Sequence, residues 1–305
     1  DFMKNTLLNR TVKISGRKDP AGTGWIYPMP DLRDYQTFHP EIKAFNRKLG
    51  LSGTKKAHSA SVDLRQWCSP VEDQLDLGSC TAHAGAGIVE YYERRAFGNH
   101  IEASRLFLYK TTRNLMEVEG DTGAWLRATM GALVLFGVPA EKYCPYKVKD
   151  YDKEPDSFLY SMAGNYQSVK YFSHDPQGSG VLTSEVLLSV KTYLEAGIPS
   201  MFGFWGFDSF ECSDSPGDIP FPGEEETARW GHAVMAVGYD DNRVIKNTRW
   251  ATETKGALLI RNSWGSGWGE EGYGWLPYDY VRYGLAMDFW SLLDMRWVDS
   301  GEFGG

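Results

Sequence analysis

The stretch "GHAVMAVGYDDNRVIKNTRWATETKGALLIRNSWGSGWGEEGYG" (residues 231–274) holds two apolar segments with a polar insertion between them. His232 stands at the head of the first segment, and Asn262 ends the second. Both segments have strand composition. The polar stretch "DNRVIKNTRWATETKG" predicts a hairpin connection, because a surface loop tolerates added length at little cost. We therefore expect a β-hairpin with a histidine near its start and an asparagine at its end.

The chain on the N-terminal side of this hairpin is mainly of helical composition. The segments with helical patterns are "SCTAHAGAGIVEYYERRAF" (79–97), "SRLFLYKTTRNL" (104–115), "AWLRATMGALVLF" (124–136) and "SEVLLSVKTYLEA" (184–196). Short strand-like segments, "SMFGFWGF" and "GYGWLPYDYV", lie on either side of the hairpin. The order predicts an α+β fold with a helical lobe over residues 61–165, a β-rich lobe over residues 166–305, and a cleft between them.

The composition fits an ordinary globular protein. The chain has 305 residues, with 42% hydrophobic and 24% charged content, and its net charge is −8. A nucleic-acid or anionic-membrane partner is therefore not expected, and basic peptide substrates fit better. No stretch approaches the roughly 18–20 apolar residues of a membrane span.

Residues 1–60 differ from the rest of the chain. The segment "SGRKDPAGTGWIYPMPDLRDYQTFHP" is rich in Gly, Pro and Asp and has neither helical nor strand periodicity. It predicts an irregular N-terminal strap or pro-segment, followed by a short helix around "PEIKAFNRKLG". The N-terminus lacks an apolar signal core, but a chain that starts at Asp1 can be a cleaved product or a cloned fragment.

The four cysteines are Cys68, Cys80, Cys144 and Cys212. None has the paired CxxC spacing of a structural zinc site, and no metal or organic cofactor is expected. If one cysteine is a free nucleophile, at most one disulfide can form. The cysteine count leaves the compartment open, with a secreted or periplasmic location slightly favoured over a cytoplasmic one.

Cys80 stands at the predicted start of a long helix. There the helix dipole and the free amide groups favour negative charge and lower the pKa of a thiol. A cysteine at a helix start is by itself more often a small buried residue. A catalytic role for Cys80 is favoured by the presence of Gln74, His232 and Asn262, because thiol catalysis needs a base and donors for an oxyanion.

The set resembles the papain family of cysteine peptidases, in order over about residues 61–295. The matching blocks are "SVDLRQWCSPVEDQ", "GVPAEKYCPY", "GHAVMAVGYDD" and "NSWGSGWGEEGYG". The resemblance implies a two-lobed papain-like fold in which Cys80 is the nucleophile and His232 the general base. It further implies that Asn262 orients the imidazole. Gln74 and the backbone N–H of Cys80 would form the oxyanion hole.

The resemblance also implies where a substrate binds. An extended peptide would pair with Gly123 and Ala124 and with the carbonyl of Gly231. Trp264 would cover the bond between His232 and Asn262, and Trp268 would wall the primed side of the cleft. Two further assignments are open: Trp125 walls a recognition pocket or belongs to a helix core, and Asp288 lies on the pocket floor or is a surface or capping residue.

The chain departs from the family pattern beside the nucleophile. The family's CGSCW reads "LGSCT" here, so Leu77 replaces a cysteine and Thr81 an aromatic residue. The partner of the missing cysteine is replaced by Asp121 in "GDTGA". Both halves of the family's disulfide are absent together, which indicates a divergent, bacterial-type member in which the fold persists without the bridge.

The chain has five histidines besides His232. His83 forms a CxxH with Cys80, but it lies on the same helix and has no second ligand pair. His39, His58, His100 and His174 lie in polar surroundings and are expected at the surface.

The expected function is an endopeptidase that acts through a thioester acyl-enzyme and is held in a zymogen-like form by residues 1–60. A papain-fold acyltransferase or deamidase shares the first half-reaction. A binding protein with a lapsed active site is opposed by the intact Cys80, His232, Asn262 and Gln74.

Overall fold

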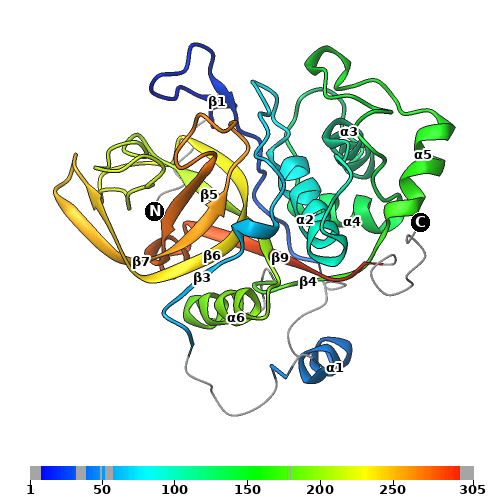
Figure 1. The fold of residues 1–305 in the computed structure, drawn as a ribbon. Coiled ribbons are helices and arrows are strands. Elements are labelled where there is room, and N and C mark those ends of the chain that lie inside the picture. Colours follow the sequence, from blue (N-terminus) through cyan, green and yellow to red (C-terminus); the bar gives the residue numbers. More distant parts are fainter. Residues whose placement is uncertain are drawn as a thin grey trace.

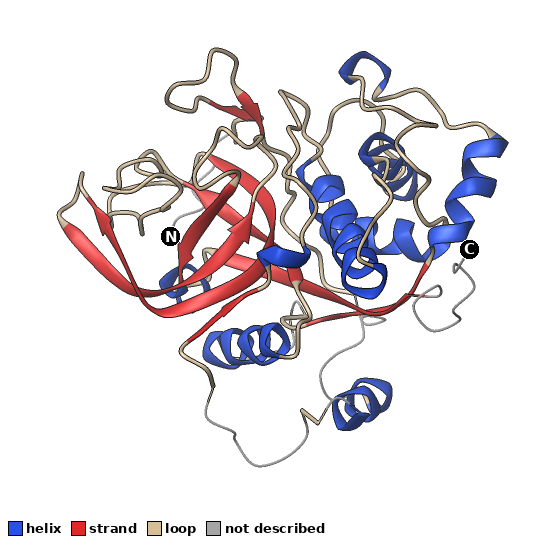
Figure 2. Cartoon of the chain, in the orientation of Figure 1, coloured by secondary structure: helices blue, strands red, loops and turns tan. Residues whose placement is uncertain are grey.

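The computed structural model describes residues 8–31, 39–48, 50–51, 58–176, 178 and 180–295. Its helices are α1 (Pro40–Lys48), α2 (Cys80–Phe97), α3 (Arg105–Leu115), α4 (Leu126–Leu135), α5 (Ser157–Ala163), α6 (Thr183–Glu195) and α7 (Tyr278–Arg282). Its strands are β1 (Thr11–Val12), β2 (Ala21–Gly22), β3 (Ser61–Asp63), β4 (Ser168–Ser173), β5 (Ser200–Gly206), β6 (Trp230–Asn247), β7 (Thr252–Arg261), β8 (Tyr273–Pro277) and β9 (Ala286–Met295). Figures 1 and 2 show α2–α5 on one side of the molecule and most of the sheet on the other. The expected α+β, two-lobed architecture is confirmed.

Helix α2 is the centre of the helical lobe, and its first twelve residues are all buried. Small side chains let its neighbours approach closely. A Cβ on Gly85 would lie 2.9 Å from the Thr129 side chain of α4, and one on Gly87 would lie 2.7 Å from the Arg261 guanidinium of β7. The helix ends at Gly98, whose φ of 75° is the left-handed conformation that favours glycine. Helix α2 is thereby fixed between its own lobe and the sheet.

The sheet carries the other half of the cleft. Its strand order is β4-β9-β5-β6-β7-β8, with β3 also paired to β6, and all these pairings are antiparallel. Strands β6 and β7 form the expected hairpin, which continues through the polar insertion with Val244 opposite Lys255 and Asn247 opposite Thr252. The insertion therefore lengthens the hairpin at its far end, beyond a register shift between Asp240 and Val244.

The segment "GYGWLPYDYV" is only partly a strand. Strand β8 ends at Pro277, and the one-turn helix α7 follows at once. Proline has no N–H to donate to a sheet, so the strand stops there. The buried side chains of Tyr278, Tyr280 and Val281 anchor the turn.

The N-terminal strap, defined here as residues 8–31, contains more order than its composition indicated. Strands β1 and β2 form a small hairpin, with Thr11 opposite Gly22. In Figure 1 the dark-blue hairpin lies above the sheet lobe, and the strap descends from it between the two lobes. The rest of the expected 1–60 segment lies partly outside the described residues. Its helix α1 packs through Ile42 against Phe172 and Tyr193, below the sheet.

No helix in the described part of the chain is long and apolar enough to cross a membrane. All four cysteines are free thiols. The backbone therefore depends on packing and hydrogen bonds for its stability.

His174 is not at the surface, as its polar neighbours in sequence had indicated. It is 1% exposed, and its ring nitrogens contact the hydroxyls of Ser189 and Ser291 at 2.8 and 3.0 Å. Burial lowers the pKa of His174 to about 3. The residue follows β4 directly, and the strand carries it into the core.

We expect His174 to make the protein sensitive to acid. Because its pKa in the folded state lies below the unfolded value of about 6.5, the unfolded state takes up the proton first, and stability falls as pH drops from about 6.5 towards 3. The free energy of unfolding should decrease from pH 7 to pH 4 in wild type, and this decrease should be up to about 3 kcal/mol smaller in the His174→Gln variant. Urea unfolding at the two pH values measures this, and equal losses would refute the assignment.

Candidate active site

Cys80 is the first residue of α2 and is fully buried. The helix starts there without a side-chain cap from Ser79, so that side chain satisfies none of the first-turn N–H groups of the helix. Burial raises the pKa of the Cys80 thiol to about 12, while the backbone N–H groups of Ala233 and Gly24 act in the opposite direction. The thiol thus lies beside β6 from one lobe and beside the strap.

His232 and Asn262 meet across the hairpin of β6 and β7. The Nε2 atom of His232 lies 2.7 Å from Oδ1 of Asn262. The same Oδ1 accepts the backbone N–H of Ser263 at 2.8 Å, which fixes the amide orientation. Because Oδ1 can only accept, Nε2 carries the proton, and the Nδ1 atom of neutral His232 has a free lone pair. Among the described residues, buried Nδ1 has no hydrogen-bond partner.

Trp264 lies flat against the imidazole. The ring centroids of Trp264 and His232 are 4.5 Å apart at an interplanar angle of 26°. Trp268 meets Trp264 edge-on at 5.5 Å. Burial lowers the pKa of His232 to about 4, and the bond to Asn262 opposes this shift. The covered site therefore holds a thiol and a neutral imidazole.

Gln74 is fully buried beside the start of α2. Its Oε1 accepts the hydroxyl of Ser263 at 2.5 Å, and its Nε2 donates to the carbonyl of Leu77 at 2.8 Å. Since a side-chain amide has two N–H groups, one donor remains for another acceptor. Ser263 was not singled out in the sequence, although its place directly after Asn262 was a usable signal.

The strap lies in the cleft and pairs with both lobes. The Ala124 N–H donates to the Gly24 carbonyl at 2.8 Å, and the Ile26 N–H donates to the Ala124 carbonyl at 3.1 Å. These two bonds form a parallel bridge between Trp25 and Ala124. On the other side, the N–H groups of Gly24 and Trp25 reach the Gly231 carbonyl at 3.2 and 3.3 Å.

Glycines allow this close approach. A Cβ on Gly24 would lie 2.2 Å from the carbonyl oxygen of Gly78, and one on Gly22 would lie 2.2 Å from that of Leu77. A Cβ on Gly123, whose φ is 74°, would likewise lie 2.2 Å from the carbonyl oxygen of Gly24. The sequence "AGTG" (21–24) is therefore shaped for the cleft, but no periodic signal marked it in advance.

The hairpin of the strap covers the end of the cleft near Trp264 and Trp268. Arg17 pairs with the Asp73 carboxylate at 3.0 Å and donates to the Trp264 carbonyl at 3.1 Å. The Trp264 indole N–H donates to the Gly22 carbonyl at 3.0 Å.

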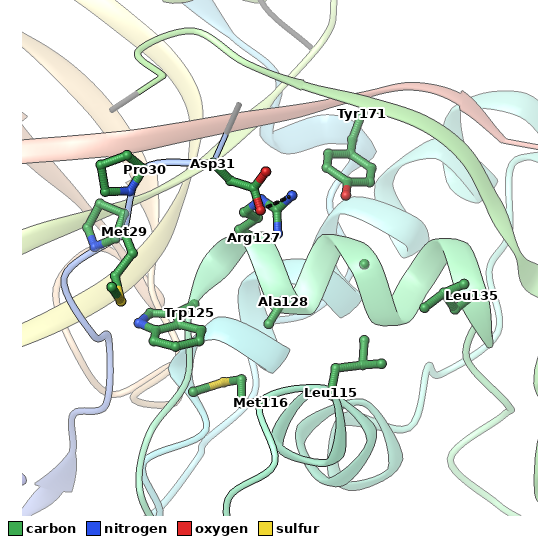
Figure 3. Close-up of a pocket in the computed structure, with 12 residues that line it drawn as sticks. Met29, Pro30, Asp31, Leu115, Met116, Trp125, Arg127, Ala128, Leu135 and Tyr171 are labelled. Carbon is green, nitrogen blue, oxygen red and sulfur yellow. Dashed lines mark ion pairs between the residues drawn. The ribbon is translucent and has the colours of Figure 1, made fainter. Parts of the chain in front are cut away.

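Trp125 lies at the opposite end of the cleft. It is half-buried and lines a cavity of about 600 Å³ together with Met29 and Met116. Figure 3 shows Trp125 below Met29 of the strap, with Arg127 of α4 paired to Asp31 at 2.9 Å. The neighbouring Leu126 is fully buried and belongs to the core.

Asp288 lies at the inner end of the space that the Trp25 side chain fills. It is 2% exposed, and its Oδ2 accepts the indole N–H of Trp25 at 2.9 Å. The structure thus brings Asp288 against the strap residue Trp25, although the two are 263 residues apart in the chain.

Asp121 stands where the resemblance placed half of a missing disulfide. Its carboxylate accepts the Gly78 N–H at 3.0 Å and the Tyr109 hydroxyl at 2.6 Å. The Tyr109 hydroxyl in turn accepts the Gly123 N–H at 3.0 Å. Hydrogen bonds therefore join the two loops that a disulfide would otherwise link.

One group in the described chain has metal-ligating side chains close together, namely Glu90, His100 and Glu102. Both oxygens of Glu90 are already engaged, by the Ser69 hydroxyl and by the Ala103 N–H. His83, the other candidate, is buried with Nδ1 3.0 Å from the Ser79 carbonyl of its own helix.

The fold and the helix-start thiol beside a histidine–asparagine pair define a class of two-lobed thiol hydrolases. The family model for papain family cysteine protease matches residues 58–291. The chain belongs to the papain family, and it is a papain-like cysteine peptidase.

Relatives span viruses, bacteria and animals. A peptidase C1-like protein of Acanthamoeba polyphaga mimivirus is 32% identical, over 89% of this chain and 86% of that protein. Cathepsin K of Gallus gallus is 25% identical, over 70% of this chain and 57% of the relative. The crystal structure of xylellain, a cysteine protease from Xylella fastidiosa, superposes with a TM-score of 0.68 at 31% identity, covering 94% of this chain and 98% of xylellain.

Proposed function

We propose that the chain is an endopeptidase in which Cys80 is the nucleophile and His232 the general base. Asn262 would orient the imidazole. The observation that carries this assignment is the His232–Asn262 bond, which leaves Nδ1 of His232 unprotonated and without a hydrogen-bond partner among the described residues. A base in this state can take the proton of a neighbouring thiol.

The proposed reaction proceeds in two halves. The thiol proton of Cys80 moves to Nδ1 of His232, and the thiolate adds to the peptide carbonyl carbon. The backbone N–H of Cys80 and the free N–H of Gln74 stabilise the resulting oxyanion. His232 then protonates the departing amine, which leaves a thioester on Cys80. Water, deprotonated by His232, adds to the thioester and releases the acid and the thiol.

We propose that a substrate binds where the strap now lies. Its backbone would pair with Ala124, beside the left-handed Gly123, and with the Gly231 carbonyl. Trp264 and Trp268 would contact the departing side of the peptide, and Trp125 the opposite end. Asp288 would face the side chain that replaces Trp25.

We further propose that the strap inhibits the enzyme. The Gly24 N–H donates to the Gly231 carbonyl at 3.2 Å, and it also opposes the rise of the Cys80 pKa. A thiolate attacks carbonyl carbon, so a strap that turns an N–H rather than a carbonyl towards the thiol would resist cleavage. Burial under the strap also keeps the thiol and imidazole neutral. When the strap leaves, water returns and favours the charged pair.

Opening the strap should raise activity. The Gly24→Ala variant of the full chain would place a methyl group 2.2 Å from the Gly78 carbonyl oxygen. Because overpacking typically costs about 1–3 kcal/mol, we expect kcat/KM to rise about 10- to 100-fold. Hydrolysis of an internally quenched peptide measures the change, and an added peptide of residues 8–31 should reverse it.

The matched control is Gly164→Ala, since a Cβ there meets nothing within 4 Å. A strap that only stabilises the lobes gives a different result. Gly24→Ala would then lower the melting temperature with no gain in kcat/KM, and inhibition by the strap would be refuted.

Product analysis tests the reaction itself. A peptide library incubated with the Gly24→Ala protein should yield internal cleavages with free acid ends, read by mass spectrometry. Transfer of the acyl group to an added amine would support an acyltransferase, and release of ammonia from glutamine a deamidase. No product of any kind would support a lapsed active site.

A further inference from the structure

The side chain of Trp25 occupies a narrow slot in the sheet lobe. We call the indole slot the space walled by Gly203, Trp205, Gly231 and Asp288. A Cβ on Gly203 would lie 2.0 Å from the indole ring, and one on Gly231 would lie 3.0 Å from it. Trp205 meets the ring edge-on with centroids 4.8 Å apart. The slot is therefore open to a flat ring because two of its walls lack side chains.

Asp288 gives the slot a polar end. Its Oδ2 accepts the Trp25 indole N–H at 2.9 Å, and its Oδ1 accepts the Trp290 indole N–H at 2.6 Å. Asp175 faces it from the end of β4 and accepts the backbone N–H of Asp288 at 2.7 Å. Burial, and then the charge of Asp288, raise the pKa of Asp175 well above its usual range. Oδ2 of Asp288 is thus the hydrogen-bond acceptor for the indole N–H of Trp25 in the slot.

We propose that the indole slot selects tryptophan in the substrate. The selected side chain belongs to the residue that pairs with Ala124, which we expect two residues before the scissile bond. This inference rests on the proposed function, because it takes the strap to occupy the substrate's place. In the strap, the indole of Trp25 lies between the glycine walls and donates its N–H to Asp288, and a tryptophan of the substrate would bind in the same way.

Other side chains match the slot less well. Phenylalanine fills the space between the glycine walls but has no N–H for Oδ2. Leucine is neither flat nor a donor. Arginine brings five N–H donors, and Oδ1 of Asp288 is already engaged by Trp290. A side chain that leaves the buried acceptor without a donor binds much more weakly. A mismatch of size alone in an apolar pocket weakens binding only modestly.

The test uses the full chain with Gly24→Ala and four peptides that differ only at the selected position: tryptophan, phenylalanine, leucine and arginine. We expect kcat/KM for tryptophan to exceed that for phenylalanine about 10- to 100-fold. Adding Asp288→Asn leaves one acceptor oxygen for two indole N–H groups and puts an NH2 group in the place of the other, so the ratio should fall towards one. Asparagine suits the backbone there, since residue 288 has a φ of 64°. Asp279→Asn, at a partly exposed position of α7 paired with Arg282, is the matched control and should leave the ratio unchanged.

A second variant tests the walls. Gly203→Ala should reduce turnover of the tryptophan peptide much more than that of the leucine peptide, because the new methyl group occupies the place of the ring. Equal rates for tryptophan and phenylalanine, or a preference for arginine, would overturn the inference and leave the peptidase assignment standing.

Hydrogen exchange does not depend on catalysis, so it distinguishes a failure of the slot inference from a failure of the proposed function. In the otherwise wild-type chain, Trp25→Phe and Asp288→Asn should each speed hydrogen exchange at the Trp25-paired amides of Ala124 and Ile26. The double variant should exchange no faster than either single one. If no peptide is cleaved, the proposed function fails, and this exchange result still decides the slot. Unchanged exchange in both single variants would overturn the slot.

Discussion

Replacing Cys80 with alanine is expected to abolish peptide hydrolysis, with a loss of at least about 10⁴-fold in kcat, the scale seen when a catalytic nucleophile is removed. The physical reason is that only Cys80 lies at a helix start beside β6 with backbone N–H groups directed at its sulfur. Steady-state kinetics in the Gly24→Ala background measure the loss, because the cleft is then open in both proteins.

The other cysteines supply the controls. Cys212 is partly exposed and lies in a turn where its N–H donates to the Ser209 carbonyl, so Cys212→Ala should retain most activity. Cys144→Ala and Cys68→Ala should do the same. The buried Cys68 thiol donates to the backbone carbonyl of Leu64 at 3.7 Å. Full activity in Cys80→Ala would end the whole account of the site.

Removing the Gln74 amide should lower kcat about 10²- to 10³-fold, the usual scale for one oxyanion donor. The Gln74→Ala variant loses a donor that Ser263 and Leu77 hold in place. Because the oxyanion exists only in the transition state and the tetrahedral intermediate, KM should change little.

Gln167→Ala is the matched control for this variant. Gln167 also donates from its side chain to a backbone carbonyl, that of Leu135 at 2.9 Å, but it is only partly buried and follows α5 in the helical lobe. Its loss should leave kcat unchanged. An unchanged kcat in Gln74→Ala would remove Gln74 from the proposed oxyanion hole.

Local signals in the sequence predicted the elements that carry the proposed chemistry. Small residues and a terminal glycine marked α2, and strand composition marked β6 and β7 on either side of a polar insertion. Because a hairpin pairs its own ends, His232 and Asn262 could be expected as neighbours despite 30 intervening steps in the chain. These predictions needed only short-range physics and a motif.

The path of the strap could not be predicted in the same way. Trp25 pairs with Ala124 and bonds to Asp288, contacts that depend on the finished cleft and leave no periodic trace in the sequence. The Asp121 network is similar, since its partners Gly78 and Tyr109 converge only after α2 and α3 have packed. Long-range contacts between loops are the part that required the structure.

One measurement tests the central claim, that Cys80 is the nucleophile and lies beneath the strap. An irreversible epoxide inhibitor of papain-like enzymes is added to the full chain and to its Gly24→Ala variant, and the labelled cysteine is mapped by mass spectrometry over time. The account predicts a single label on Cys80, forming faster in Gly24→Ala. A label on Cys68, Cys144 or Cys212 in place of Cys80, or equal labelling rates in the two proteins, would contradict it.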